Sequence, residues 1–277
     1  MLARRLECVD LDQILRHLPK ERSVTDIGTE LVNIAQLKIR CSGCSLRELC
    51  LPIGLAPMDM QQLDQLVTAR RKLKRGAYIY QTNQPFHALY AIRVGFFKTF
   101  NTSADGREQV TGFYMPGELL GMDAISADIH SCDAMALEDS ELCEIPFTDL
   151  ERLSRDIPAL QHQFHKIMSR EIMREHGLMM LLGNMRAEER LATFLLNLSQ
   201  RFKARGFSAH RFHLRMTRND IGLYLGLKLE TVSRMFSKFR DEGILRISNK
   251  YLEIDDIDAL RRLAQRDECA LPTIPRR

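Results

Sequence analysis

The stretch "MTRNDIGLYLGLKLETVSRMFSKFRDEGIL", residues 216–245, predicts the architecture of the C-terminal part of the chain. It indicates a short helix over Arg218–Leu225, a turn at Gly226 and a second helix over Leu229–Asp241. Four apolar residues can meet across the turn, as two crossed helices require: Ile221, Leu225, Val232 and Phe236. The stretch therefore predicts a helix-turn-helix, with a plain helical hairpin as the alternative.

The segment around these two helices is strongly basic. Between Arg186 and Lys250 it has fourteen Lys or Arg and six Asp or Glu, a net charge of +8 on a chain whose total is +4. A basic segment on an otherwise acidic chain is typical of a protein that binds a polyanion. Early positions of the second helix of such a pair meet base edges in the major groove of double-stranded DNA. Arg234 can donate two bonds to guanine, Glu230 can accept from cytosine, and Ser233 offers a smaller contact.

Two regions of β-structure are expected, one before the helix pair and one after it. From about residue 70 to 147, short runs of β-branched and aromatic residues alternate with turn residues, a pattern that predicts a small antiparallel roll or barrel. After the helix pair, "RISNKYLEI" (residues 246–254) predicts a two-stranded wing with its turn at Ser248–Asn249.

A long amphipathic helix is expected between the roll and the helix-turn-helix. It begins at Pro158 and runs for about 25 residues, nearly 40 Å at about 1.5 Å per residue. Apolar residues at spacings of three and four form a stripe along it: Leu160, Phe164, Ile167, Met168, Ile172, Met179 and Leu182. A helix of this kind between two domains is a natural dimerisation element, although a helix that covers the core of the roll has the same periodicity.

These elements predict an α+β protein in four parts. We expect an N-terminal extension with a cysteine loop (1–52), a β-roll sensor domain (53–153), a dimerisation helix (154–184) and a winged helix-turn-helix domain (185–277). No run of 18 apolar residues and no secretory signal is present, so no membrane association and a cytoplasmic location are expected.

Three of the seven cysteines lie close together in "CSGCSLRELC", residues 41–50. In a reducing compartment, clustered thiols indicate metal ligands or redox groups before disulfides. Their C-x2-C-x5-C spacing leaves one ligand to be found elsewhere, and from spacing alone an iron–sulfur cluster and structural zinc are both open. An iron–sulfur redox carrier is the alternative from another class, but the chain has no glycine-rich dinucleotide motif and no second cluster motif.

The order of roll, long helix and winged helix-turn-helix resembles the bacterial CRP/FNR superfamily of transcription regulators. "LETVSR", residues 229–234, resembles the recognition helix of its FNR branch. The resemblance runs from about Arg40 to Gln265 and implies a homodimer, not an enzyme, in which Glu230, Ser233 and Arg234 read the half-sites of a palindromic TTGAT-type sequence. Lys228 departs from the pattern, because relatives often have a capping Ser or Thr before this helix.

The same resemblance implies a 4Fe–4S cluster held by Cys41, Cys44, Cys50 and a fourth cysteine in the roll, which it assigns to Cys143 in "ELCEIPF". Cys132 is the competing candidate for that position. The implied function is an oxygen-responsive regulator of anaerobic gene expression. In such a regulator the intact cluster favours a dimer that binds DNA, and oxygen returns the protein to monomers.

The resemblance also raises three questions about ligands and partners. "PGELLG" (116–121) matches a motif for cyclic nucleotides, but "ADIHSCDAMA" (127–136) offers no Arg or Lys for the phosphate, so we expect no cyclic nucleotide. Glu175, with Ile172 and Met179 on the long helix, matches an acidic position at the dimer seam, where like charges oppose association. The hairpin 101–109 is of the kind that relatives present to RNA polymerase.

Overall fold

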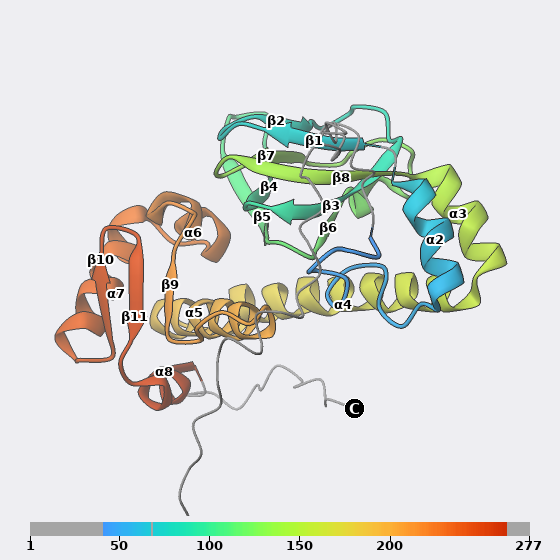
Figure 1. Ribbon diagram of the computed structural model, residues 1–277. Helices are drawn as coiled ribbons and strands as arrows, with labels where there is room; N and C mark the ends of the chain where they lie inside the picture. Colours follow the sequence, from blue (N-terminus) through green and yellow to red (C-terminus); the bar gives the residue numbers. More distant parts are fainter. Residues whose placement is uncertain (1–40, 68, 265–277) are drawn as a thin grey trace, which may run out of the picture. The chain divides into compact units, whose positions relative to one another are not determined.

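The computed structural model describes residues 41–67 and 69–264 (Figure 1). Residues 1–40 of the predicted N-terminal extension (1–52) lie outside these described residues, as do Cys8 and Cys269. The described chain begins with a series of turns over residues 41–54, which we call the cysteine loop. Helix α2 (Pro57–Leu66) then leads into the strands.

Two four-stranded antiparallel sheets form the roll (Figure 1). The first has the order β1-β8-β3-β6, formed by Ala69–Leu73, Ser140–Pro146, Ala88–Val94 and Leu119–Leu120. The second has the order β2-β7-β4-β5, formed by Tyr78–Tyr80, Asp133–Ala136, Phe97–Thr102 and Glu108–Tyr114. Ile92, Phe97 and Leu142 are fully buried in one of the cores of the roll. The predicted antiparallel roll is confirmed.

Three helices accompany the roll: the short 3-10 turn η3 (Met122–Ala124), α3 (Phe147–Asp156) and the long α4 (Pro158–Asn184). The 27 residues of α4 confirm the long helix that the sequence predicts, with its start at Pro158. Its first part is a core helix, because Leu160 is fully buried in the cluster that also contains Leu51 of the cysteine loop. Farther along, Ile172 and Met179 are 55% and 63% exposed. The interpretation as a core helix is therefore confirmed for the first part of α4, and dimerisation through the exposed part stays a prediction.

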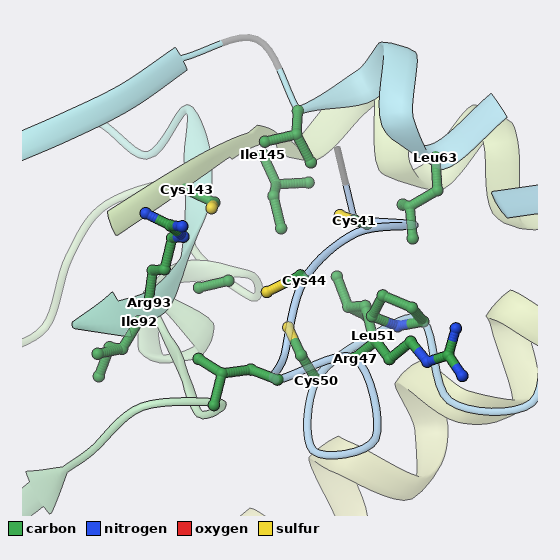
Figure 2. Close-up of a pocket in the computed structure, with 14 residues that line it drawn as sticks. Cys41, Cys44, Arg47, Cys50, Leu51, Leu63, Ile92, Arg93, Cys143 and Ile145 are labelled. Carbon is green, nitrogen blue, oxygen red and sulfur yellow. The ribbon is translucent and has the colours of Figure 1, made fainter. Parts of the chain in front are cut away.

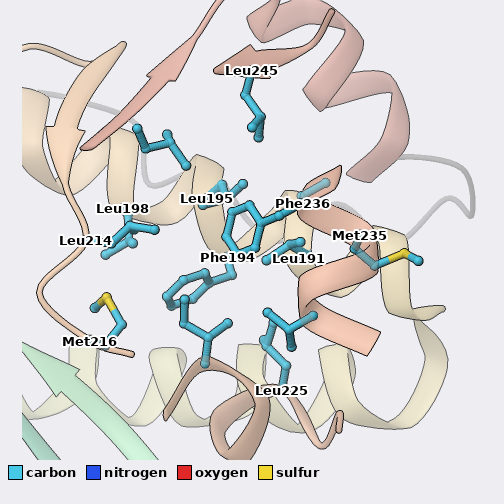
Figure 3. Packing of buried hydrophobic residues seen from close by; sticks show 14 of the residues in the cluster. Leu191, Phe194, Leu195, Leu198, Leu214, Met216, Leu225, Met235, Phe236 and Leu245 are labelled. Atoms are coloured by element: carbon cyan, nitrogen blue, oxygen red, sulfur yellow. The ribbon is translucent and has the colours of Figure 1, made fainter. Parts of the chain in front are cut away.

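The C-terminal part of the chain is a winged helix-turn-helix. It consists of α5 (Ala187–Ala204), β9 (Arg211–His213), α6 (Arg218–Leu225), α7 (Leu229–Asp241), β10 (Leu245–Ser248), β11 (Tyr251–Ile254) and α8 (Ile257–Ala264). The bounds of α6 and α7 are those that the sequence predicts. The strands of the wing are also confirmed, but they are joined by Asn249 and Lys250, one residue later than expected, with Asn249 at φ +56°. Side chains of α5 and α7 fill the core, Leu191, Leu195 and Phe236 among them (Figure 3).

The two helices of the motif begin in different ways. Thr217 caps α6 in a reciprocal box, because its side chain accepts a bond from the Asp220 N–H while the Asp220 carboxylate accepts from the Thr217 N–H. Lys228 provides no side-chain cap for α7, as its chemistry predicts. Gly222 allows the close approach of the turn, since a Cβ there would lie 2.5 Å from the Leu227 carbonyl oxygen.

One carboxylate joins the roll to the helices that follow it. Glu118, in the turn before β6, accepts bonds of 2.6 Å from Arg201 of α5 and from Arg205, the residue that follows α5, and it lies 3.9 Å from Arg174 of α4. Burial alone would raise the pKa of Glu118, but the three guanidinium groups outweigh burial and hold that pKa below its ordinary value. Gly117 and Glu118 of "PGELLG" thus form a turn that also anchors α5 to the roll.

Glu118→Gln removes the charge that three guanidinium groups share. Breaking a buried ion pair at one partner costs about 3–5 kcal/mol. Since the Glu118 side chain keeps 21% of its exposure, we expect a loss near the lower end, about 3 kcal/mol. Urea unfolding at neutral pH, followed by circular dichroism, measures it.

The contribution of Glu118 to the free energy of unfolding should fall as the pH is lowered. Because the pKa of Glu118 is lowered on folding, its stabilisation is present at neutral pH and is lost as the pH falls through the lowered pKa.

The control for Glu118→Gln is Glu230→Gln, at an exposed site in α7, which should change the free energy of unfolding by less than about 0.5 kcal/mol. Equal losses in both variants would contradict the role of Glu118.

Candidate metal centre and nucleic-acid interface

The cysteine loop is built from consecutive tight turns. The Cys44 N–H donates to the Cys41 carbonyl at 3.1 Å, and the Cys50 N–H donates to the Leu46 carbonyl at 3.1 Å. These turns fold the C-x2-C-x5-C segment back on itself. All three loop cysteines are therefore partly buried along one short stretch of backbone.

Three contacts hold the cysteine loop to the rest of the fold. Leu51 is 1% exposed and packs in a core cluster that includes Leu63 of α2. Ser42 donates from its hydroxyl and its N–H to the Asp64 carboxylate, at 2.7 and 3.1 Å. The third contact is with Gly117, at φ +90°, where an added Cβ would lie only 2.7 Å from the Cβ of Leu49. Residue spacing did not indicate the Ser42–Asp64 anchor.

The four cysteines of the expected ligand set line one pocket (Figure 2). Cys41, Cys44 and Cys50 come from the loop, whereas Cys143 comes from β8 and is 93 positions after Cys50 in the sequence. Apolar side chains fill much of the remaining lining, including Leu46, Leu51, Leu63 and Ile145. We call this site the cysteine pocket.

The competing cysteine lies elsewhere. Cys132 is 7% exposed and packs in a different core cluster of the roll, with Ile79 and Tyr80. Burial raises its pKa, and the neighbouring Asp123 raises it further. Its surroundings are those of an inert buried thiol, and it is not among the residues that line the cysteine pocket.

Burial raises the pKa of three pocket thiols, those of Cys41, Cys50 and Cys143. The pKa of Cys50 rises from an ordinary 9.0 to about 12, and burial together with Cys50 and Cys143 raises that of Cys41 as well. For Cys143, burial and Cys44 raise the pKa while Arg70 and Arg93 lower it. These cysteines therefore lie close enough to influence one another electrostatically.

The donor set can be compared with the geometry that different metal centres require. Within the described ranges, no three Cys, His, Asp or Glu side chains are grouped tightly enough to hold a metal ion. A zinc site needs four ligand atoms about 2.0–2.3 Å from one ion. The thiolates of a 4Fe–4S cluster stand farther apart, because each binds a different iron. Four thiols around one pocket fit the wider arrangement in their number and their chemistry.

The second helix of the helix-turn-helix presents its early residues to solvent. Glu230 and Arg234 are exposed, and Ser233 is half-buried beside them. Neither Glu230 nor Arg234 forms an ion pair with any residue that the structure describes, so both can contact a ligand. Behind them, Val232 and Phe236 are buried and fix the orientation of the helix.

Comparisons with known proteins agree with this geometry. The Crp-like helix-turn-helix domain matches residues 189–263, and the cyclic nucleotide-binding domain matches residues 70–156. The transcriptional activator protein anr of Pseudomonas aeruginosa is 46% identical over 224 residues, which are 81% of this chain and 92% of that protein. The fumarate and nitrate reduction regulatory protein of Escherichia coli strain K12 is 43% identical over 226 residues, 82% of this chain and 90% of that protein.

The chain belongs to the CRP/FNR family of transcription regulators. Among solved structures, FixK2 from Bradyrhizobium japonicum has a TM-score of 0.68 and 30% identity, and the match covers 74% of this chain and 100% of that one. The chain is thus a DNA-binding regulator and not an enzyme, and the expected fold is confirmed. No helix within residues 41–67 and 69–264 is both long and apolar enough to cross a membrane.

This CRP/FNR regulator has a second solvent-facing basic feature, at the tip of the wing. His213, Ser248, Asn249, Lys250 and Tyr251 line a shallow hollow there. Our expected DNA contacts did not include these residues. The sequence feature that could have indicated this hollow is Lys250, because it lies in the turn of the wing that follows the recognition helix.

The expected dimer residues of the regulator share one surface of α4. Ile172 and Met179 are exposed, as are Met173 and Met180. Spacings of one, seven and eight residues place these four side chains on one stripe of a helix. Glu175 lies beside the stripe, half-buried, and burial raises the pKa of its carboxyl.

A pH-dependent reactivity follows for the metal-free regulator. Only the thiolate is nucleophilic, so at pH 8 Cys50 should react with iodoacetamide about a thousandfold more slowly than an ordinary thiol. Its rate should rise about tenfold per pH unit between about pH 7 and 9, because its pKa lies above that range. Peptide mass spectrometry after quenched alkylation measures this rate, with the urea-unfolded chain as control. A rate that levels off below pH 9 would contradict the buried, protonated thiol.

Proposed function

We propose that this chain is an oxygen-responsive transcription regulator that holds a 4Fe–4S cluster on Cys41, Cys44, Cys50 and Cys143. The observation that carries the proposal is the cysteine pocket, where the four cysteines meet although Cys143 is 93 positions from the loop. The relatives support it, since one protein at 44% identity is the anaerobic regulatory protein of Pasteurella multocida. Structural zinc at the same thiols is the alternative, whereas the iron–sulfur electron carrier is set aside because the chain belongs to a family of transcription regulators.

When bound, the cluster would supply an oxygen-labile cross-link between the cysteine loop and β8. The loop residue Leu51 packs in the same cluster as Leu160, at the start of α4. Leu49 abuts Gly117, and Glu118, which follows Gly117, binds Arg201 of α5 and Arg205 just after α5. The position of the loop can therefore affect both the long helix and the DNA-binding domain.

We infer that the exposed stripe of α4 is the seam of a homodimer. Ile172 and Met179 supply apolar surface to it, and Glu175 places a carboxylate close to its twin. Repulsion between like charges keeps such a dimer near its threshold, so a small change at the cysteine loop shifts the balance between monomer and dimer. Loss of the cross-link in air would then shift this balance toward monomers.

The dimer presents two copies of α7 to a palindromic TTGAT-type site. In this proposal Arg234, Glu230 and Ser233 contact base edges. The hairpin 101–109, ordered by bonds of the Asp105 carboxylate with Ser103 and Arg107, contacts RNA polymerase.

The roll of this regulator acts without a cyclic nucleotide in our proposal. Residues 127–136 contain no Arg or Lys to bind its phosphate. Asp133 in this segment is already engaged, since it accepts bonds of 2.7 and 3.1 Å from the N–H and hydroxyl of Thr82.

We also propose that the chain divides into four parts, with boundaries at residues 52, 153 and 184, and that the protein is cytoplasmic.

Arg234→Ala should abolish discrimination between a TTGAT site and scrambled DNA. One bidentate contact contributes about 1–3 kcal/mol of base discrimination, or about 5- to 150-fold in affinity. Gel shifts with both DNA sequences measure it, on anaerobic protein with its cluster content checked by absorbance. Arg240→Ala, near the other end of the same helix, is the matched control and should keep its discrimination. Retained discrimination in Arg234→Ala would refute the assignment.

Cys143→Ala should remove bound iron and sulfide, and Cys132→Ala should leave both unchanged. Only Cys143 of this pair lines the cysteine pocket. Iron and sulfide assays on the two anaerobically prepared variants make the comparison, with circular dichroism to check the fold. If the two variants exchange these outcomes, Cys132 is the fourth ligand.

A further inference from the structure

Strand β3 has a bulge beside the cysteine pocket. Ile92 pairs with Leu142 of β8 and Val94 pairs with Glu141, so Arg93 is an extra residue between two paired ones. A β-bulge re-aims the side chain of its extra residue. Arg93 lines the cysteine pocket, and Figure 2 shows it next to Cys143.

A second arginine flanks Cys143 from the opposite neighbouring strand. Arg70 of β1 is directly opposite Cys143 in the antiparallel register, and directly opposite residues project from the same face of a sheet. Cys143 is therefore flanked by Arg70 on one side and by the bulged Arg93 on the other. The side chains of both arginines are about one third exposed, 34% and 37%.

One carboxylate connects the two arginines. Glu141 precedes Cys143 by two residues in β8, so the two side chains share a face. It accepts a 2.7 Å bond from Arg93 Nη1 and lies 3.4 Å from Arg70 Nε. Two guanidinium groups and one carboxylate leave a net positive charge beside Cys143. The pKa of Cys143 responds accordingly, because both arginines lower it and Glu141 raises it against the larger effect of burial.

We propose that Arg70, Arg93 and Glu141 form a charge triad that sets how readily a cluster in the cysteine pocket is oxidised. This inference rests on the proposed function. A 4Fe–4S core held by four thiolates is a net anion, and it becomes less negative when dioxygen takes one electron from it and is reduced to superoxide. Nearby positive charge stabilises the more negative form. The arginines therefore oppose this step, and Glu141 weakens their opposition.

Removing a positive charge and removing a negative charge from the triad should change the rate of cluster oxidation in opposite directions. Arg93→Gln should make the colour of the anaerobically prepared full chain bleach in air about threefold faster. It should also lower the reduction potential measured by spectroelectrochemistry. Glu141→Gln should change both quantities in the opposite direction. Arg93→Lys keeps the charge and should resemble the wild type, as should Arg240→Gln, which removes one positive charge from α7 in the DNA-binding domain.

The outcomes separate this inference from the function on which it rests. If the wild type binds iron and bleaches in air but Arg93→Gln and Glu141→Gln do not differ from it, the triad has no electrostatic role. If both variants bleach faster, the triad serves only to pack the strands. A wild-type protein that binds no iron would overturn the proposed function and this inference together.

Discussion

The carboxylate of Glu118 is the charge at which the roll, α4 and the end of α5 are joined. It receives hydrogen bonds from Arg201 of α5 and from Arg205 just after α5, and it lies near Arg174 of α4, so three segments far apart in sequence meet at one charge. Buried guanidinium groups need a compensating anion, and a buried carboxylate needs its cations, so neither side is stable without the other. A second buried pair, Lys98 with Asp220 at 2.8 Å, joins β4 to the start of the helix-turn-helix.

The turn that carries Glu118 also contacts the cysteine loop, through Gly117 and Leu49. A side chain at position 117 would collide with the loop, so the backbone itself forms this contact. In the proposed mechanism, the loop is held both by Leu51 in the core and by the cluster cross-link of its three cysteines to Cys143. Loss of the cross-link leaves the packing of Leu51 and the Ser42–Asp64 bonds to hold the loop.

Sequence reasoning succeeded where the determinants are local. Apolar spacing and the turn at Gly226 define α6, and Pro158 marks the start of α4. The stripe of α4 could not be assigned to core or surface from periodicity, because both environments select the same residue types. The wing turn was misplaced by one residue, since Ser, Asn and Lys are all tolerated in turns and only Asn249 has positive φ.

The determinants of the site that were not predictable are long-range. Nothing near Cys143 marks it as the partner of a loop 93 positions away, so only the family resemblance indicated it. The pairs Lys98–Asp220 and Glu118–Arg205 span 122 and 87 positions, and charged residues carry no label of their partner. The bulge at Arg93 depends on the pairing register of two strands, which a single sequence does not specify.

The most direct test of the account is an anaerobic purification with an absorbance spectrum, iron and sulfide assays and a measurement of molar mass, each repeated after exposure to air. The account predicts a brown protein with about four irons per chain that is dimeric before exposure, and bleached and monomeric after it. A colourless protein that holds zinc, with the same mass and the same DNA affinity before and after air, would contradict the oxygen switch.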